Sequence, residues 1–322
     1  MKKNKILVTG GAGFIGSHLT DKLLIGNYEV CCVDSFDPFY DVNEKRDNVN
    51  THLNYKNYQL HEGNIENKAF IIDVFSKFKP DIVVHLAAKA GVRPSVENPF
   101  SYEQTNIVGT LNILEACVKY KVKKFVNGSS SSVYGLNESI PFKESDPLNL
   151  IASPYAATKL ASEAFCHTYY NIYKIPIINL RFFTVYGPRQ RPDLAIRKFM
   201  TKILKNEPIE IYGDGRTSRD YTYVEDIVAG IIQSMHYNKK EYDTFNLGNS
   251  NPIELIDLVR KIEIAVNKNA IIKYTPTQKG DVPVTYADIS KSENRLGYSP
   301  KTILDQGLKN MADWIKNTKL IS

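Results

Sequence analysis

The sequence predicts an α/β protein with a doubly wound parallel sheet, followed by a smaller, mixed α/β lobe. Short apolar runs alternate with amphipathic segments through the first half of the chain, the pattern of repeated strand–helix units joined by right-handed crossovers. Residues 82–88 are almost all apolar, as expected for a strand buried on both faces of a parallel sheet. A glycine cluster at residues 10–16 directly follows the first apolar run, where a strand is expected to turn into a helix.

The elements of the first half follow from this alternation. A first helix is expected through Leu19, Leu23 and Leu24, and a later one has Pro154 in its first turn, where helices tolerate proline. The strands are predicted at residues 6–8, 29–33, 58–61, 82–88, 124–129 and 177–182. The helices after the first are predicted at residues 69–78, 100–120 and 154–173, of which the last is the one that begins at Pro154.

The second half is predicted to form the smaller lobe. It begins with a loop at residues 186–193 that is rich in turn-forming residues and arginine. Helices are predicted at residues 196–205, 224–235, 253–266 and 303–315, and strands at residues 209–212, 245–247 and 271–274. The chain is therefore expected to divide into residues 1–181 and residues 182–322, with segments near 224–250 returning to the large sheet.

Composition excludes several classes of function. The chain has 41 Lys and Arg against 35 Asp and Glu, with no groove-like pattern of bases and aromatic residues, so no nucleic-acid partner is expected. No apolar run reaches transmembrane length, and the run after Met1 is broken by glycines, which indicates a first strand rather than a signal peptide. The four cysteines lack C-x-x-C spacing, so we expect buried free thiols in a reducing cytoplasm and no metal site.

The glycine cluster has the spacing of a phosphate-binding turn. In this pattern Gly10 permits the turn, Gly13 lets the backbone approach a pyrophosphate, and Gly16 allows close helix–strand packing. The free N–H groups and the positive dipole end of the new helix then face the phosphates.

A carboxylate stands where such a turn needs one. Asp34 ends the second predicted strand, 18 residues beyond Gly16. It is positioned to accept hydrogen bonds from the ribose hydroxyls of an adenine dinucleotide and to repel a 2′-phosphate. The alternative is a glycine-rich turn that binds nothing, but the position of the acid favours a Rossmann-type NAD site.

A candidate proton-transfer group lies in the helix predicted over residues 154–173. Tyr155 and Lys159 are four residues apart and so share one helix face. A phenol has a reference pKa of about 10, and a nearby Lys ammonium and a cationic nicotinamide both favour the phenolate. Ser130 follows a strand end and is expected to pass a proton or to bind the reacting hydroxyl. An ordinary surface Tyr–Lys pair is the alternative, but its combination with the dinucleotide turn favours catalysis.

These motifs resemble those of the extended short-chain dehydrogenase/reductases that act on nucleotide sugars. The resemblance covers essentially the whole chain and rests on the glycine turn, Leu86-Ala87-Ala88, Asn106, SSSSVYG at 129–135, Tyr155 with Lys159, and Arg219-Asp220-Tyr221. It implies the fold, a tightly held NAD and catalytic roles for Tyr155, Lys159 and Ser130. The cofactor-binding residues are then expected to be Gly10, Gly13, Phe14, Ile15, Gly16, Asp34, Asn64, Ile65, Leu86, Ala87, Ala88, Asn106, Tyr155 and Lys159.

The resemblance also implies a binding site for a UDP-sugar. A loop arginine is expected to contact the diphosphate and an aromatic side chain to lie beside the uracil, for which Arg219 and Tyr212 are the candidates. The substrate-binding residues are expected to be Ser130, Ser131, Ser132, Thr184, Arg191, Tyr212, Arg219 and Asp281.

Within this family the chain is most similar to the UDP-glucuronate 4-epimerases. The similarity lies in residues 34–41, 90–99, 129–135 and 181–188. Thr184 stands where epimerases of neutral sugars usually carry Asn. Together with Ser131, Ser132 and Arg191 it is expected to bind the C6 carboxylate by charge-assisted hydrogen bonds.

The chain also departs from the pattern of these epimerases. Lys89 replaces a frequent Gln, Asn64 an expected Asp, and Arg189-Gln190 a Trp-Gly pair, while Gln278 stands where neutral-sugar epimerases commonly have Arg. Dehydratases and decarboxylases of the family place an acid beside the catalytic hydroxyl, where this chain has Ser131 and Ser132.

The expected reaction is therefore the NAD-dependent 4-epimerisation of UDP-glucuronate to UDP-galacturonate through a 4-keto intermediate. One alternative is a UDP-glucose or UDP-N-acetylhexosamine 4-epimerase, and a second is a non-catalytic NAD-binding regulatory protein. Family resemblance further implies a homodimer with a two-helix seam formed by residues 100–120 and 154–173.

Overall fold

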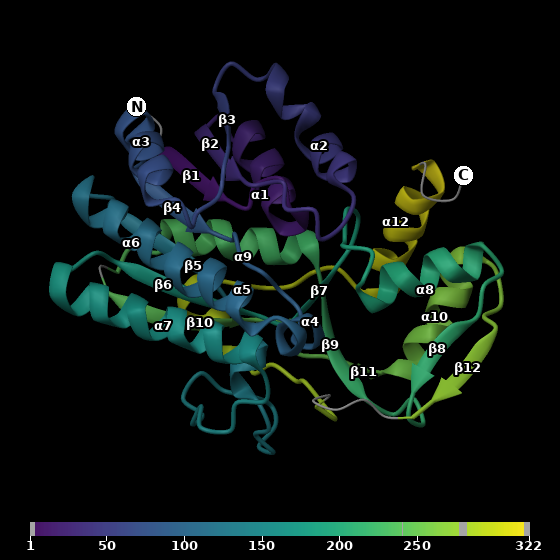
Figure 1. Cartoon of the computed structure of the whole chain (residues 1–322). Helices are drawn as coiled ribbons and strands as arrows, with labels where there is room; N and C mark the ends of the chain where they lie inside the picture. Colours follow the sequence, from purple (N-terminus) through teal and green to yellow (C-terminus); the bar gives the residue numbers. More distant parts are fainter. Residues whose placement is uncertain (1–3, 240, 277–281, 319–322) are drawn as a thin grey trace.

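A seven-stranded sheet forms the centre of the larger part of the molecule (Figure 1). The computed structural model describes residues 4–239, 241–276 and 282–318. Every neighbouring pair of strands in this sheet is parallel. In spatial order the strands are β10 (Tyr242–Leu247), β6 (Ile177–Phe182), β5 (Lys124–Ser130), β4 (Ile82–His85), β1 (Lys5–Thr9), β2 (Glu29–Asp34) and β3 (Tyr58–Glu62).

Helices cover both faces of this sheet, because successive strand residues point to opposite sides. Val8 belongs to a core shared with the helices of one face, and Leu7 belongs to a core shared with those of the other. The first face carries α1 (Phe14–Ile25) and α9 (Val224–His236), and the second carries α3 (Lys68–Phe78), α6 (Thr110–Lys119) and α7 (Pro154–Tyr173). The predicted doubly wound α/β fold is confirmed.

The strand order reverses between β1 and β4, and ligands of such sheets bind beyond the carboxyl ends of the strands at this point. The segments that leave this edge carry most of the predicted site. They are the glycine turn after β1, Asp34 at the end of β2, Leu86 after β4 and the serine run at the end of β5.

The smaller lobe lies beside this edge and contains two further sheets (Figure 1). The bounds of the predicted helices and strands in this lobe agree with the structure to within a few residues. Three further short strands were not predicted. The lobe contains α8 (Ala195–Leu204), α10 (Leu255–Val266), α12 (Leu304–Asn317), the pair β8 (Ile209–Tyr212) and β12 (Ile272–Thr275), and the unpredicted sheet of β7 (Thr184–Tyr186), β9 (Ser218–Tyr223) and β11 (Pro252–Glu254).

Two predictions for the first half are wrong in detail. The helix predicted over residues 100–120 forms without a gap, but its regular α-helical geometry is interrupted: it consists of α5 (Pro99–Glu103), a π-helical segment (Gln104–Gly109) and α6. Such π-helical segments are frequent at functional sites. The strand predicted over residues 82–88 ends at His85 because the Thr9 hydroxyl accepts hydrogen bonds from the next two backbone N–H groups.

Several short elements lack the apolar periodicity from which helices are predicted. The mostly polar α2 starts at an Asp41 cap whose carboxylate accepts from the Asn43 N–H. The unpredicted helices are α2 (Val42–Asn50), α4 (Val92–Glu97) and α11 (Ser290–Leu296), together with 3₁₀ turns at His52–Asn54 and Ser131–Tyr134.

Two segments from the second half lie with the large sheet. β10 pairs with β6, and α9 packs in the core on the face of α1. The division of the chain into residues 1–181 and 182–322 stays a prediction.

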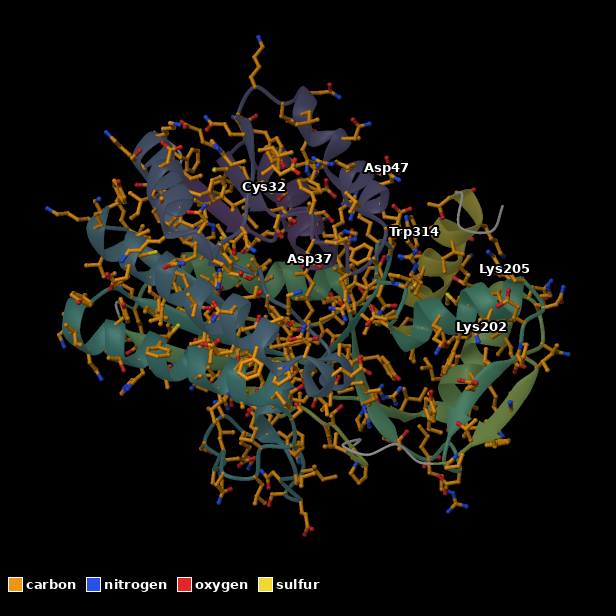
Figure 2. All side chains as sticks on the ribbon, in the orientation of Figure 1. Cys32, Asp37, Asp47, Lys202, Lys205 and Trp314 are labelled. Carbon is orange, nitrogen blue, oxygen red and sulfur yellow. The ribbon has the colours of Figure 1, made fainter. Side chains whose placement is uncertain are left out.

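All four cysteines are buried and unbonded, and Cys32 lies among the strands of the large sheet (Figure 2). Across the described ranges, no helix is both long enough and apolar enough to span a membrane.

Candidate active site

The turn after β1 has the geometry that its three glycines predict. Gly10 has a φ of +71°, which L side chains rarely adopt, and a Cβ there would lie 2.8 Å from Ala87 N. A Cβ on Gly16 would lie only 2.1 Å from Gly10 O. At Gly13 the nearest described atom is Gly10 O, 3.2 Å from the ideal Cβ. The first and third glycines therefore serve close packing, and at the second, at the start of α1, a Cβ would be less closely confined.

The beginning of α1 and the end of β2 complete this cradle. Gly13 caps the helix without a side-chain hydrogen bond, and the first turn, which starts at Phe14 and Ile15, contains no acid. Asp34 accepts from Ala12 N at 3.0 Å and from Phe36 N at 2.9 Å. Burial raises the pKa of Asp34, although these two hydrogen bonds oppose the shift. A glycine-rich turn beside a buried carboxylate fits the pyrophosphate and the ribose of an adenine dinucleotide.

Asn106 holds the segment after β4 against α7. Its side chain accepts from Lys89 N at 2.8 Å and donates to Lys89 O at 2.9 Å. It also donates to the Thr158 hydroxyl at 3.0 Å, and Thr158 donates to Tyr155 O. The segment 86–89, which includes the expected Leu86, Ala87 and Ala88, is thereby tied to the helix that carries Tyr155.

Tyr155 lies near both a hydroxyl and a positive charge. Its side chain is hydrogen-bonded with Ser130, and the Arg191 guanidinium lies near enough to act on it electrostatically. Burial raises the pKa of Tyr155, whereas Ser130 and Arg191 lower it, and the net shift is upward. In the structure the Arg191 charge favours the phenolate of Tyr155. The same effect expected of Lys159 stays a prediction.

Lys159 lies one turn further along α7 and is buried. Its ammonium donates to Gly128 O at 2.7 Å. Burial lowers the pKa of Lys159 to about 8, against the opposing charge of Glu163. The ammonium is therefore readily deprotonated for a lysine, and it is oriented by the backbone of β5.

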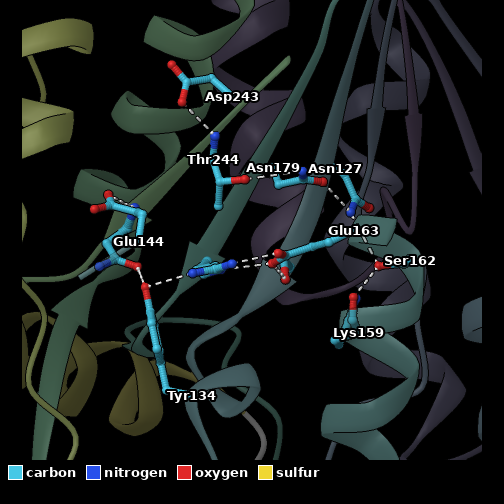
Figure 3. A network of polar contacts seen from close by, with 12 residues as sticks. Asn127, Tyr134, Glu144, Lys159, Ser162, Glu163, Asn179, Asp243 and Thr244 are labelled. Carbon is cyan, nitrogen blue, oxygen red and sulfur yellow. Dashed lines mark hydrogen bonds and ion pairs between the residues drawn. The ribbon is translucent and has the colours of Figure 1, made fainter. Parts of the chain in front are cut away.

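A buried ion pair between Arg181 and Glu163 lies close to Lys159. Arg181 donates two hydrogen bonds to Glu163, at 3.0 and 2.8 Å, and a third to the Tyr134 hydroxyl (Figure 3). Glu163 also accepts from the Ser129 hydroxyl at 2.5 Å. Sequence reasoning missed Glu163, although its position four residues after Lys159 on a helix is a signal for a shared face.

The groups expected to bind a carboxylate lie around the same edge of the sheet. Ser132 is hydrogen-bonded with Ser130, the last residue of β5. Ser131 is the first residue of the 3₁₀ turn (Ser131–Tyr134) that follows this strand. Thr184 begins β7, two residues beyond Phe182, which is paired with Ser130 across β5 and β6.

Arg191 already has a carboxylate partner. It donates to both oxygens of Asp193, at 3.0 and 2.8 Å, and lies over the Phe39 ring. Within the described ranges, the side-chain hydrogen bonds of Arg191 go to Asp193, and none joins its guanidinium to Thr184 or the serines. The sequence contained no sign of this pair beyond the two-residue spacing.

The remaining expected residues are less closely associated with Tyr155. Tyr212, at the end of β8, is covered by the Arg93 guanidinium 4.6 Å from its ring centroid, and Arg219 donates to Ser218 O at 2.8 Å.

On the cofactor side, Ile65 is buried and Asn64 is exposed. Asp281 and Gln278 lie outside the described residues.

Comparison with known proteins identifies the family. A model of the GDP-mannose 4,6 dehydratase family matches residues 7–311. The chain belongs to this family. The expected resemblance to the extended short-chain dehydrogenase/reductases is thereby confirmed.

Three relatives within this family are informative. A UDP-glucuronate 4-epimerase of Thermodesulfobacterium geofontis is 40% identical over 98% of this chain and 97% of its own. The crystal structure of the Bacillus cereus UDP-glucuronic acid 4-epimerase with UDP-glucuronic acid and NAD is 37% identical, covers 97% of this chain and 99% of its own, and gives a TM-score of 0.91. A Thermotoga maritima UDP-glucose 4-epimerase with UDP-glucose is 34% identical, covers 97% and 98%, and gives a TM-score of 0.89.

Proposed function

We propose that this protein is a NAD-dependent UDP-sugar 4-epimerase, an isomerase, that interconverts UDP-glucuronate and UDP-galacturonate. The observation that carries the proposal is the position of Tyr155, which lies beside the Ser130 hydroxyl and near enough to Arg191 for its charge to favour the phenolate. A proton acceptor beside a fixed cation suits a sugar that presents both a hydroxyl and a carboxylate. The B. cereus relative, solved with UDP-glucuronic acid and NAD, supports the same substrate.

The cofactor-binding residues are proposed to act in three groups. Gly10, Gly13 and Gly16 with the start of α1 hold the pyrophosphate, and Asp34 binds the adenosine ribose. Asn64 and Ile65 lie on the adenine side, while residues 86–88, fixed by Asn106, line the nicotinamide side. When bound, NAD supplies the acceptor and donor of the hydride at C4 of the sugar.

The protein's own part in the reaction is to move one proton and to keep the sugar in place. Tyr155 accepts the proton of the C4 hydroxyl, and Ser130 orients that hydroxyl. Lys159, held by Gly128 O, supports the developing phenolate and binds the nicotinamide ribose. The 4-keto sugar then turns within the site, and Tyr155 returns the proton after the opposite face is reduced.

The carboxylate needs control because oxidation at C4 makes the sugar a β-keto acid. Such an acid loses CO₂ when its C5–carboxylate bond is aligned with the carbonyl π system. Arg191, Thr184, Ser131 and Ser132 are proposed to hold the carboxylate out of that alignment by charge-assisted hydrogen bonds. Arg191 exchanges part of its pairing with Asp193 for the substrate.

The UDP portion is proposed to lie toward the smaller lobe. Arg219 contacts the diphosphate, and Tyr212 lies beside the uracil, where the ring is now covered by Arg93. Asp281 is proposed as a further contact.

A neutral-sugar 4-epimerase is the second candidate. It is favoured by the similarity to the T. maritima UDP-glucose enzyme and by the fact that Asp193 already neutralises Arg191. A regulatory NAD-binding protein is disfavoured, since regulation alone does not require Ser130, Tyr155 and Lys159 together.

A homodimer and a cytoplasmic location are also proposed. Large apolar side chains are exposed within the two segments of the predicted seam, namely Phe100 on α5 and Ile172 and Tyr173 on α7, which supports pairing of these segments with a second copy. The buried free thiols are consistent with a reducing compartment. Light scattering tests the dimer, and a stable monomer at micromolar concentration rejects it.

A panel of UDP-sugars followed by NMR without added NAD tests the proposed function. UDP-galacturonate is expected to form from UDP-glucuronate, while UDP-glucose and UDP-N-acetylglucosamine react slowly or not at all. Turnover of only the neutral sugars makes the second candidate correct, and turnover of none supports the regulatory protein.

A further inference from the structure

The loop at residues 187–193, which carries Arg191, is fastened to helix α1 by two contacts. His18 Nε2 donates to Pro188 O at 2.9 Å. Arg189 Nη1 donates to Asp21 Oδ2 at 2.7 Å. His18 and Asp21 are three residues apart and so lie on one face of α1. The same helix begins at the glycine turn, so one rigid element connects the cofactor cradle to this loop.

The carboxylate of Asp21 is itself held in place. Its second oxygen is 2.5 Å from Nε2 of His52, whose side chain is only 1% exposed. Burial opposes ionisation of Asp21, but the hydrogen bond from His52 and the charge of Arg189 prevail and lower its pKa. Asp21 is therefore a fixed, ionised anchor for Arg189.

His18 acts as a neutral donor in this arrangement. Burial and the neighbouring Arg189 charge lower the pKa of His18 to about 4. The ring is thus uncharged at neutral pH, and the proton on Nε2 is the one that Pro188 O accepts. This contact adds to the Asp21–Arg189 pair without competing with it.

Gln190, which lies between Arg189 and Arg191, is fixed by a separate set of contacts. Gln190 Nε2 donates to Val185 O, and Arg197 donates to Gln190 O at 2.6 Å. Arg197 in turn pairs with both oxygens of Glu44 on α2 and stacks on Trp314 of α12, which is labelled in Figure 2. Arg191 therefore emerges from a loop whose preceding residues are both held.

We propose that Asp21 and Arg189 are positioning residues that set Arg191 toward the substrate carboxylate, an inference that rests on the proposed function. Neither residue touches the sugar in this account. Arg189 has a φ of +62°, which turns the backbone between Pro188 and Arg191.

The test compares Arg189→Ala and Asp21→Asn with two reference variants. Arg189→Lys keeps a cation for Asp21 and serves as the conservative rescue. Lys22 also lies on α1, and its exposed ammonium pairs with Glu225 of α9. Lys22→Ala removes this pair and serves as the matched control. For each folded variant, kcat and KM for UDP-glucuronate are measured, products are analysed by NMR, and hydrogen exchange of residues 187–194 is followed.

Loss of the anchor is expected to raise KM for UDP-glucuronate about three- to tenfold, to change kcat less, and to increase the share of 4-keto-pentose. Exchange in residues 187–194 is expected to accelerate in Arg189→Ala and Asp21→Asn, and to stay native in Arg189→Lys and Lys22→Ala. Native KM, product ratio and exchange in Arg189→Ala overturn the inference, as does a loss confined to kcat. A native protein that ignores UDP-glucuronate rejects the proposed function instead, and the exchange comparison then still decides whether Asp21 and Arg189 hold the loop.

Discussion

The side chain of Asn106 forms a closed pair of hydrogen bonds with the backbone of Lys89. Its Oδ1 accepts from Lys89 N at 2.8 Å, and its Nδ2 donates to Lys89 O at 2.9 Å. The π-helical segment that interrupts the expected helix is what places Asn106 there. A backbone loop beyond β4 is thereby fixed by one side chain.

Asn106→Asp is expected to release this loop, because a carboxylate cannot donate to Lys89 O or to the Thr158 hydroxyl. Leaving buried groups unpaired costs about 1–3 kcal/mol of the free energy of unfolding. Denaturant unfolding and NAD titration are the measurements, and both stability and NAD affinity are expected to fall. Asn54→Asp, at an exposed position, is the control. If the two variants behave alike, Asn106 does not hold the loop.

Tyr155→Phe is expected to bind NAD and UDP-sugar but to lose turnover by about 10²–10⁴-fold, because only the proton acceptor is removed. Tyr102→Phe is the matched control, since the Tyr102 ring packs against Tyr155 and its hydroxyl donates only to Ala90 O. Steady-state rates and calorimetry separate the two effects. Near-native turnover in Tyr155→Phe removes this residue from the mechanism.

Asp34→Ala is expected to weaken NAD binding and to reduce discrimination against NADP, because the carboxylate that accepts from the ribose and repels a 2′-phosphate is lost. Affinities for both cofactors are measured by calorimetry on protein freed of cofactor. Asp47→Ala, at an exposed position on α2 (Figure 2), is the control. An unchanged NAD/NADP ratio means that another residue reads the ribose.

Arg191→Ala is expected to slow epimerisation of UDP-glucuronate and to release a 4-keto-pentose and NADH. Losing one charge-assisted hydrogen bond costs about 1.5–3 kcal/mol, which changes partitioning about tenfold or more. Thr184→Val, which keeps the side-chain shape, is expected to act in the same direction. Product NMR and NADH absorbance report the leak, with the exposed Arg260→Ala as control. Clean epimerisation by both site variants places the carboxylate elsewhere.

The sequence predicted those parts of the molecule that are defined by local spacing. The glycine turn, Asp34 and the Tyr155–Lys159 pair depend on neighbours within a turn of helix or one strand–helix unit, so their pattern is visible in the chain. The long parallel strands were predicted for the same reason, because continuous apolar character is a local property.

The interactions that the sequence did not reveal join residues far apart in the chain. Arg189 meets Asp21 across 168 positions, and Arg197 meets Glu44 across 153. The strands β7, β9 and β11 are short and mostly polar, so their pairing depends on the lobe around them. The catalytic and binding roles of the predicted site residues stay predictions that the experiments above address.

The central claim is that hydride leaves C4 of UDP-glucuronate and returns to the opposite face of the same carbon within one site. The most direct measurement uses UDP-glucuronate carrying deuterium at C4, incubated with the protein in ordinary water without added NAD and followed by NMR. The expected product is UDP-galacturonate that retains the deuterium at C4. Loss of the label to solvent, or the absence of UDP-galacturonate while a neutral UDP-sugar is epimerised, would contradict it.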